Sequence, residues 1–178
     1  MYIGEAKLMG ATKGVTRSDI QVCRPTGCIS LDTSHVVIST GSRSHKPTKL
    51  HPGNVPITFI KNKVIDSTQL SSMLDLPKSV VIIGGGVIAV EYATVLAELS
   101  VGVTLICSES SFLPFVEKDL KRSLKRRMKK NKILIVHLDI DKIMIDEMTE
   151  KVKVQMDTDP LRPEKPNRVF TVDTVIYR

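Results

Sequence analysis

Two kinds of hydrophobic pattern, one typical of buried strands and one typical of helices, alternate along residues 78–138. Three apolar, β-branched runs predict buried strands, "KSVVIIGGG" (78–86), "VGVTLIC" (101–107) and "KILIVHL" (132–138). Between them, residues 87–99 and 116–128 carry apolar positions at the spacing of a helix. Strand and helix in alternation predict a βαβαβ unit with a parallel sheet.

Short extended segments follow this unit and predict a β-meander. They are "DKIMID" (141–146), "KVKVQM" (151–156), "NRVFTV" (167–172) and "DTVIYR" (173–178). The polar, proline-rich stretch "DPLRPEKPN" is typical of a hairpin loop. The predicted fold class is α/β, with a Rossmann-like βαβαβ parallel sheet and a β-meander.

The first part of the chain has a period of two, which predicts a β-hairpin. Proline and glycine in "RPTG" (24–27) are typical of a tight turn. With the turn placed there, the register pairs Val22 with Ile29 and Ile20 with Leu31.

A proline-rich segment separates the two parts. Before it, "HVVISTG" (35–41) is an apolar run stopped by glycine and predicts a buried strand. Residues 42–56 hold three prolines and scattered charges, which indicate a linker or a long loop. We therefore expect one domain segment over 1–48, a linker over 49–65 and the βαβαβ domain over 66–178.

Composition is ordinary for a soluble globular protein, with 42% hydrophobic and 25% charged residues. No stretch reaches the about 20 apolar residues of a membrane span, and "MYIGEAKLMG" lacks the features of a secretory signal. Three cysteines do not make a disulfide framework. We expect a cytoplasmic protein with no membrane partner and no metal site.

Much of the net charge of +7 lies in residues 118–132. Such a cluster attracts nucleic acid by charge alone. However, Val116, Leu120, Leu124 and Met128 recur every four residues and form an apolar stripe, so the cations fit the solvated face of a helix. Because no aromatic residue lies among the cations to stack on bases, we do not expect nucleic acid as a partner.

The motif Gly84-x-Gly86-x-x-Ala89 closes the first strand of the βαβαβ unit and opens its first helix. A dinucleotide pyrophosphate requires close backbone approach, donor N–H groups and the positive end of a helix dipole. Gly84 fits the tight turn, Gly86 leaves space for the phosphates, and Ala89 lets the helix pack closely on the strand. Together with Val87 and Ile88, these residues form the predicted binding site for NAD or NADP. The alternative is a glycine-rich turn without a ligand.

The residues after the second strand bear on the choice of cofactor. An acid there binds the ribose diol of NAD, and an arginine binds the 2′-phosphate of NADP. Cys107 stands where the acid is usually found, Glu109 comes two residues later, and no arginine follows. Glu109 and the missing arginine favour NAD, with both cofactors left open. Glu91 is a further candidate, because a carboxylate in an apolar helix run is costly without a partner.

Together these residues resemble a known family. "VVIIGGGVIAVEYATVLAELSVGVTLI" strongly resembles the nucleotide-binding domain of the class I, flavin-dependent pyridine nucleotide-disulfide oxidoreductases. These include dihydrolipoamide dehydrogenase, glutathione and mercuric reductases and the soluble pyridine nucleotide transhydrogenase. "VIDSTQLSSMLDLPKSV" resembles the start of the NAD domain in this family, and "VDTVIYR" its last strand.

The resemblance extends to the first part of the chain and implies FAD contacts there. "GEAKL", with Glu5 and Ala6, resembles the strand whose backbone meets the FAD adenine. "VVISTGSR" resembles the motif that ends the FAD domain, with Ser39, Thr40 and Gly41 in its place. The first region would then be the C-terminal remnant of an FAD-binding domain.

Within the first helix, the resemblance implies particular roles. It gives Glu91 a contact with the nicotinamide carboxamide in the flavin pocket, which would explain a buried carboxylate. Ala89 replaces the usual third glycine, as it does in some NADPH-using members. Ser100 stands where the helix usually ends in glycine, and would cost about 1 kcal/mol if its backbone must be left-handed.

"GGGVIAVEYA" and "FLPFVEKDL" are most similar to the soluble transhydrogenase branch. The expected function is therefore the nucleotide-binding portion of an FAD-dependent oxidoreductase that transfers hydride between NAD(P)H and flavin. A dihydrolipoamide dehydrogenase or another disulfide reductase is the alternative within the family. The alternative from another class is a non-catalytic Rossmann module that binds RNA or a protein through its basic helix.

The family's own FAD glycine motif, redox centre and dimerisation domain are not in this sequence, so we expect a fragment with no catalytic residue of its own. A homodimer is expected only for the full-length family. Cys23 and Cys28 have the spacing of the redox pair, but they lie downstream of the adenine strand, in the hairpin. As cross-strand neighbours with Cβ atoms ~5 Å apart they could oxidise, yet we interpret the spacing as a coincidence of the turn.

Overall fold

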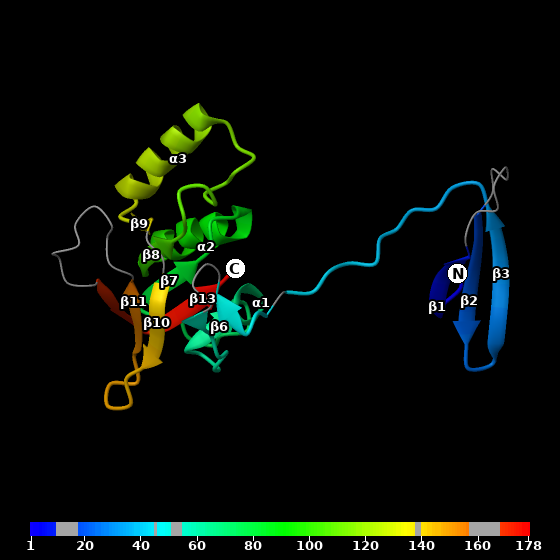
Figure 1. The fold of residues 1–178 in the computed structure, drawn as a ribbon, viewed down its shortest axis with the longest axis horizontal. Coiled ribbons are helices and arrows are strands. Elements are labelled where there is room, and N and C mark those ends of the chain that lie inside the picture. Colours follow the sequence, from blue (N-terminus) through cyan, green and yellow to red (C-terminus); the bar gives the residue numbers. More distant parts are fainter. Residues whose placement is uncertain (10–17, 45, 51–54, 138–139, 157–167) are drawn as a thin grey trace. The chain divides into compact units, whose positions relative to one another are not determined.

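The computed structural model describes residues 1–9, 18–44, 46–50, 55–137, 140–156 and 168–178. The chain forms two compact units, Met1–Arg43 and Ser44–Arg178, which Figure 1 draws in the colours of the sequence.

The first unit is a three-stranded antiparallel sheet in the order β1-β2-β3. The strands are β1 (Glu5–Met9), β2 (Ser18–Arg24) and β3 (Gly27–Thr33). The hairpin turn lies between β2 and β3, and the register pairs Val22 with Ile29 and Ile20 with Leu31. The hairpin, its turn and its register were all correctly predicted.

Residues 35–41 do not form the buried strand that their apolar run predicted. They carry no strand or helix, and Val37 and Ile38 are 89% and 71% exposed. A strand requires a neighbour for its backbone N–H and C=O groups, and among the described residues none pairs with this segment. The prediction was wrong because β-branched composition indicates a fit to a sheet, not the presence of a partner strand.

The second unit is built on a five-stranded, fully parallel sheet in the order β6-β13-β7-β8-β9. Its strands are β6 (Val64–Asp66), β13 (Thr174–Tyr177), β7 (Ser79–Ile83), β8 (Gly102–Ile106) and β9 (Leu134–Val136). Helix α2 (Val87–Glu98) connects β7 to β8, and α3 (Lys118–Lys130) connects β8 to β9. This is the predicted Rossmann-like βαβαβ unit.

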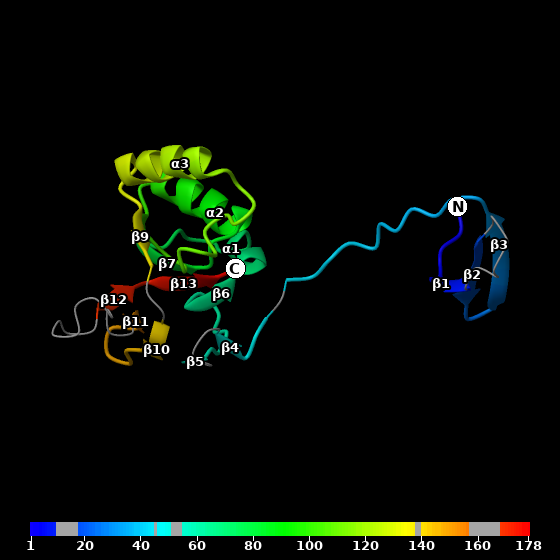
Figure 2. The same ribbon diagram turned by 45° about the horizontal axis from the view of Figure 1, so that its top comes forward.

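Two layers cover the two faces of this sheet (Figure 2). Helices α2 and α3 lie on one face. A meander lies on the other, and it consists of β10 (Ile140–Ile145), β11 (Val152–Met156) and β12 (Val169–Val172). The predicted meander is therefore present, although the last predicted segment, β13, returns to the parallel sheet. The predicted loop over 159–167 lies outside the described residues.

The side chains of β7 show why this strand is apolar along its whole length. Val80 and Ile82 pack into the core beneath the helices, and Val81 and Ile83 pack into the core beneath the meander. All four are buried. A strand covered on both faces has no solvent side, so its sequence is a continuous hydrophobic run.

The described residues of the predicted linker, 49–50 and 55–65, contribute to the core of the second unit. They contain the short antiparallel pair β4 (Lys49–Leu50) and β5 (Val55–Pro56), and the start of β6. Leu50, Val55 and Ile57 are buried against the meander layer. The prolines indicated a loop, but the apolar residues among them bury hydrophobic area.

Helix α3 packs on the core through most of the predicted apolar stripe, with one exception. Met128 is buried and Leu124 and Val116 are partly buried, but Leu120 is 64% exposed. A helix has 3.6 residues per turn, so a spacing of exactly four drifts by about 40° at each step. The Lys121 side chain is half-buried, whereas that of Leu120 is exposed.

Candidate functional site

Three successive glycines follow β7, and each has different surroundings. Gly84 has a φ of +131° and a Cβ there would collide with the backbone of Arg178. A Cβ on Gly85 would lie 2.5 Å from the carbonyl oxygen of Ser111. A Cβ on Gly86 would meet no atom within 4 Å. The first two glycines are therefore required by packing, and only the third borders open space.

Gly86 is also the residue from which α2 begins. It is the N-cap, with extended backbone (φ −78°, ψ 176°) and no side-chain hydrogen bond, and its carbonyl accepts from Val90 N–H at 3.2 Å. The N–H groups of Val87, Ile88 and Ala89 precede that bond and have no acceptor within the helix. They point out of the positive end of the helix dipole, which is favourable for an anion.

Parallel pairing brings the two halves of the predicted site to one edge of the sheet. Ile83, at the end of β7, is paired with Ile106 at the end of β8. The N–H of Gly84 donates to the carbonyl of Ile106 at 2.9 Å. Cys107 and Glu109, which follow β8, therefore lie at the same edge as the glycine turn.

Cys107 is the free cysteine of the described chain and its side chain is buried. Burial raises the pKa of its thiol to about 11, with Glu109 adding to the increase and Lys125 opposing it. The thiol is therefore neutral at physiological pH. Position 107, after the second strand of the βαβαβ unit, is where an acid is usually found, and in this chain it carries no charge.

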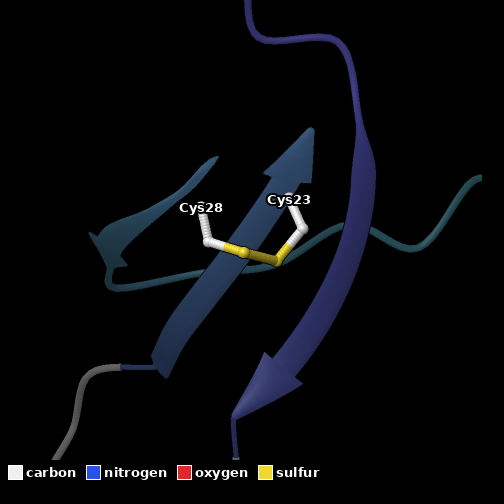
Figure 3. The surroundings of a disulfide bond; sticks show 2 residues. All are labelled: Cys23 and Cys28. Atoms are coloured by element: carbon white, nitrogen blue, oxygen red, sulfur yellow. A yellow bond between two sulfur atoms is a disulfide. The ribbon is translucent and has the colours of Figure 1, made fainter. Parts of the chain in front are cut away.

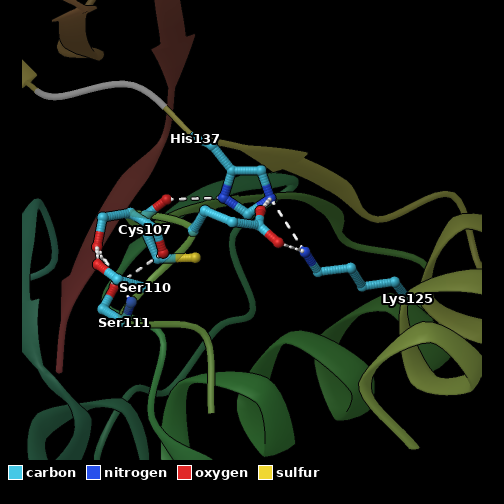
Figure 4. A network of polar contacts seen from close by, with 7 residues as sticks. Cys107, Ser110, Ser111, Lys125 and His137 are labelled. Carbon is cyan, nitrogen blue, oxygen red and sulfur yellow. Dashed lines mark hydrogen bonds and ion pairs between the residues drawn. The ribbon is translucent and has the colours of Figure 1, made fainter. Parts of the chain in front are cut away.

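Glu109 is held in a polar network with Lys125 and His137, two residues that Figure 4 labels. Its Oε1 lies 2.7 Å from Lys125 Nζ and its Oε2 lies 2.7 Å from His137 Nε2. The hydrogen bond from Lys125 lowers the pKa of the Glu109 carboxyl, and the charges of His137 and Lys121 act in the same direction, while partial burial opposes them. The carboxylate is ionised and both of its oxygens are engaged.

Lys125 and His137 were not predicted from the sequence to lie at this edge, although both contact Glu109. Lys125 was assigned to the solvated face of α3, and His137 was treated as part of a strand. His137 directly follows β9, so it lies at the carboxyl edge of the sheet together with the residues after β7 and β8. Its position after the third parallel strand was the available signal, because ligands bind at that edge.

Glu91 is exposed, and not buried as its apolar surroundings suggested. It lies on the outer face of α2, where Val87 and Val95, four residues before and after it, are 45% and 54% exposed. The run is apolar on both faces of the helix, so its composition does not distinguish the core side from the outer side.

The residues proposed by resemblance to contact FAD all belong to the first unit. Glu5 and Ala6 lie on β1, where they pair with Cys23 and Val22 of β2. Ser39, Thr40 and Gly41 lie in the exposed segment that forms no strand.

Cys23 and Cys28 form a disulfide across the hairpin (Figure 3). They face each other in the register of β2 and β3, with Cα atoms 4.0 Å apart, as the sequence predicted. The four residues between the two cysteines include the hairpin turn. Any two residues at positions 23 and 28 would therefore face each other across the strands.

The described part of the chain holds neither a cluster of metal ligands nor a helix fit to span a membrane. There, no group of three or more His, Cys, Asp or Glu side chains is arranged to hold a metal ion. Within the same residues, no helix has the length and apolar character to cross a membrane.

The fold and this edge of the sheet define a class of protein. A family model described as pyridine nucleotide-disulphide oxidoreductase matches residues 8–177. The chain belongs to this family, whose members depend on FAD and on NAD or NADP.

Among particular proteins, the chain is 31% identical over 129 residues to the soluble pyridine nucleotide transhydrogenase of Pseudomonas paraeruginosa, covering 72% of this chain and 26% of the relative. The flavoprotein disulfide reductase RclA from Escherichia coli is 25% identical, with a TM-score of 0.62 over 89% of this chain and 32% of that one. LpdA from Mycobacterium tuberculosis is 20% identical with a TM-score of 0.64, over 98% of this chain and 35% of that one, and shows the shared fold. The chain spans about a quarter of the length of the transhydrogenase relatives.

Proposed function

We propose that the second unit binds NAD(H) or NADP(H), with the pyrophosphate over Gly86 and the adenosine ribose near Cys107 and Glu109. The observation that carries this proposal is the open space at Gly86, beside two glycines that are packed against backbone. The free N–H groups at the start of α2 supply the donors that a diphosphate requires. The residues present therefore fit the dinucleotide.

We further propose that this unit is the nicotinamide nucleotide-binding part of an FAD-dependent oxidoreductase most similar to the soluble transhydrogenase. The family match over residues 8–177 and the transhydrogenase relatives support it. Such an enzyme passes hydride between nicotinamide and flavin, and the task of this chain is to bind and orient the dinucleotide. The exposed carboxylate of Glu91 is available to contact the nicotinamide carboxamide.

For the first unit we propose FAD contacts through the β1 backbone at Glu5 and Ala6 and through Ser39, Thr40 and Gly41. The support is the resemblance of these two stretches to the FAD domain. Titration of the full chain with FAD, followed by quenching of flavin fluorescence, tests this proposal. Fluorescence that stays equal to that of free FAD up to millimolar protein would contradict it.

The dinucleotide site is tested by replacing Gly86. A side chain there occupies the open space, so Gly86→Val should weaken NADH and NADPH binding by at least about tenfold in calorimetry. The backbone of Gly86 is extended, so the circular dichroism spectrum and the midpoint of thermal unfolding should stay close to those of the parent. Gly102→Ala is the matched control, because Gly102 begins β8 at the opposite edge of the sheet. Equal affinity of Gly86→Val and parent would place any bound nucleotide elsewhere.

The branch of the family is tested with a longer protein that contains this chain. A transhydrogenase needs only the flavin between two nicotinamides, whereas a disulfide reductase also needs two thiols through which electrons leave. We expect hydride transfer from NADPH to an NAD analogue without lipoamide, and a redox helix with Cys-x4-Thr or another pair that lacks one thiol. An intact thiol pair with lipoamide-dependent NADH formation would assign the protein to the dehydrogenases.

A further inference from the structure

Lys125 and His137 share one anionic partner. Glu109 lies 2.7 Å from Lys125 Nζ through one oxygen and 2.7 Å from His137 Nε2 through the other, and the two nitrogens are 3.4 Å apart. They come from different elements, α3 and the segment after β9, and converge at the carboxyl edge of the sheet (Figure 4). Each oxygen of Glu109 thus already contacts one of these two side chains, so a ribose diol would have to share the carboxylate with them.

These three side chains differ in their exposure and in their other contacts. Glu109 is 71% exposed, whereas Lys125 and His137 are 29% and 30% exposed. The Lys125 ammonium lies 4.9 Å from the ring centre of Phe112, which is fully buried. His137 Nδ1 lies 3.0 Å from the carbonyl oxygen of Cys107. The two nitrogens are held by the protein, and the carboxylate can rotate into solvent.

We propose that Lys125 and His137 form a phosphate-binding pair that selects NADP(H) over NAD(H), and that the 2′-phosphate displaces Glu109 from them. This inference rests on the proposed function. A phosphate offers three acceptor oxygens and up to two negative charges, so it gains more than a single carboxylate from the Lys125 ammonium and from a His137 ring that carries a proton on both nitrogens. Only that form donates from Nε2 while Nδ1 donates to the carbonyl of Cys107. Lysine is a common phosphate ligand. Cys107, at the end of β8, is uncharged and so does not repel the phosphate as an acid there would.

Adenosine 2′,5′-bisphosphate and AMP are suitable probes, because they differ in the 2′-phosphate alone and carry no nicotinamide. In calorimetry with the full chain, the bisphosphate should bind at least about tenfold more tightly than AMP. NADPH should exceed NADH by a similar factor. AMP binding as tightly as the bisphosphate, or NADH as tightly as NADPH, would overturn the inference.

Two variants separate the roles of the cation and the carboxylate. Lys125→Met keeps the stem against Phe112 and removes the charge, so it should weaken bisphosphate binding by about tenfold and leave AMP unchanged. Glu109→Gln removes the competing anion from an exposed position, so it should tighten bisphosphate binding and leave AMP unchanged. Lys129→Met, four residues along α3 and exposed, is the control for a general loss of charge and should change neither. If Glu109→Gln instead weakens AMP and NADH, then Glu109 binds the diol and the inference is wrong.

Dinucleotide binding by the parent and by Gly86→Val distinguishes a failure of this inference from a failure of the proposed function. Equal binding of NADH and NADPH, with both lost in Gly86→Val, would overturn the selection for NADP and leave the dinucleotide site intact. Absence of binding by either dinucleotide would overturn both.

Discussion

The α-carbon of Gly84 faces the backbone carbonyl of Arg178 so closely that no side-chain atom fits between them. The N–H of Arg178 donates to the carbonyl of Ile83 at 2.9 Å, so the end of β13 is tied to the end of β7 where the glycine turn begins. Gly84 thus serves the packing of the sheet, whereas Gly86, the last of the three successive glycines, borders the open space that we propose the pyrophosphate occupies.

Gly84→Ala should therefore destabilise the second unit, whereas Gly86→Ala should not. At Gly84 a methyl group meets backbone and φ is +131°, so we expect the free energy of unfolding to fall by about 3 kcal/mol. At Gly86 the expected cost is about 1 kcal/mol or less, which is typical of alanine at an N-cap. Urea denaturation followed by circular dichroism measures both. Equal losses in the two variants would contradict the division of roles.

Ser100 ends α2 in a left-handed conformation that favours glycine. Its φ is +65°, and the N–H of Val101 donates to the carbonyl of Leu96 at 3.0 Å, which is the bond of a Schellman cap. Ser100→Gly should raise the free energy of unfolding by about 1 kcal/mol. Ser100→Ala is the matched control and should not raise it. Chemical denaturation of the three proteins tests this, and a destabilised Ser100→Gly variant would refute the assignment of strain.

Lys132 has the same place at the end of α3. Its φ is +61°, and the N–H of Ile133 donates to the carbonyl of Met128 at 3.0 Å. Lys132→Gly should also stabilise the unit by about 1 kcal/mol. The double variant with Ser100→Gly should show the sum of the two gains, provided the two caps act independently.

Asp66 should make the stability of the second unit depend on pH. It caps α1 (Ser67–Leu70) and lies 2.9 Å from Lys46 Nζ, and its side chain is 2% exposed. Burial alone raises its pKa, but hydrogen bonds from Thr68, Lys46 and the backbone of Gln69 outweigh burial and lower the pKa from 3.8 to about 2. A carboxyl with a depressed folded-state pKa stabilises above its unfolded pKa. We expect a loss on the order of 2 kcal/mol as the pH falls from about 4 to 2.

Asp66→Asn keeps a good N-cap but removes the titrating charge. The variant should therefore lose less stability than the parent over the same pH interval, measured by urea denaturation at each pH. Asp119→Asn is the control, since Asp119 is 89% exposed in α3. If the pH dependence of Asp66→Asn matches that of the parent, other carboxyl groups cause the loss.

The disulfide should have no part in nucleotide binding. Cys23 and Cys28 belong to the hairpin of the first unit, and the glycine turn belongs to the second. Replacing both with serine should leave the affinity for NADH and NADPH unchanged in calorimetry, and should leave the rate unchanged in any longer, active protein. A hundredfold loss of rate would show that the pair has a redox role. Counting thiols before and after reduction monitors the bond in the parent.

Patterns local in the sequence predicted this fold well, and contacts between distant segments account for what was missed. The β-branched runs around Val80 and Val103 predicted strands because both faces of the sheet are covered. The turn at 24–27 was enough to place Cys23 beside Cys28. By contrast, the ion pair between Lys125 and Glu109 depends on how α3 packs on the sheet. That packing cannot be predicted from a local sequence pattern.

Two further errors have the same origin. Leu120 was assigned to the core from its spacing, yet which side of α3 faces the sheet is set by tertiary packing. Glu91 was expected to be buried, because the run around it is apolar on both sides of α2. Periodicity identifies a helix with confidence, but it identifies the buried face only when the opposite face is polar.

Strand β13 lies between β6 and β7, although it follows all the other described strands in the chain. Val175 pairs with Val64 on one side and with Val81 on the other, so the sheet remains in two pieces until this segment inserts. Val175 is far from both Val64 and Val81 in the sequence. Parallel pairing between such distant segments forms slowly, because the chain between them loses conformational entropy before the strands make any contact. Strand β13 therefore completes the sheet at its centre and not at an edge, and we expect the insertion of its four residues to limit the rate of folding.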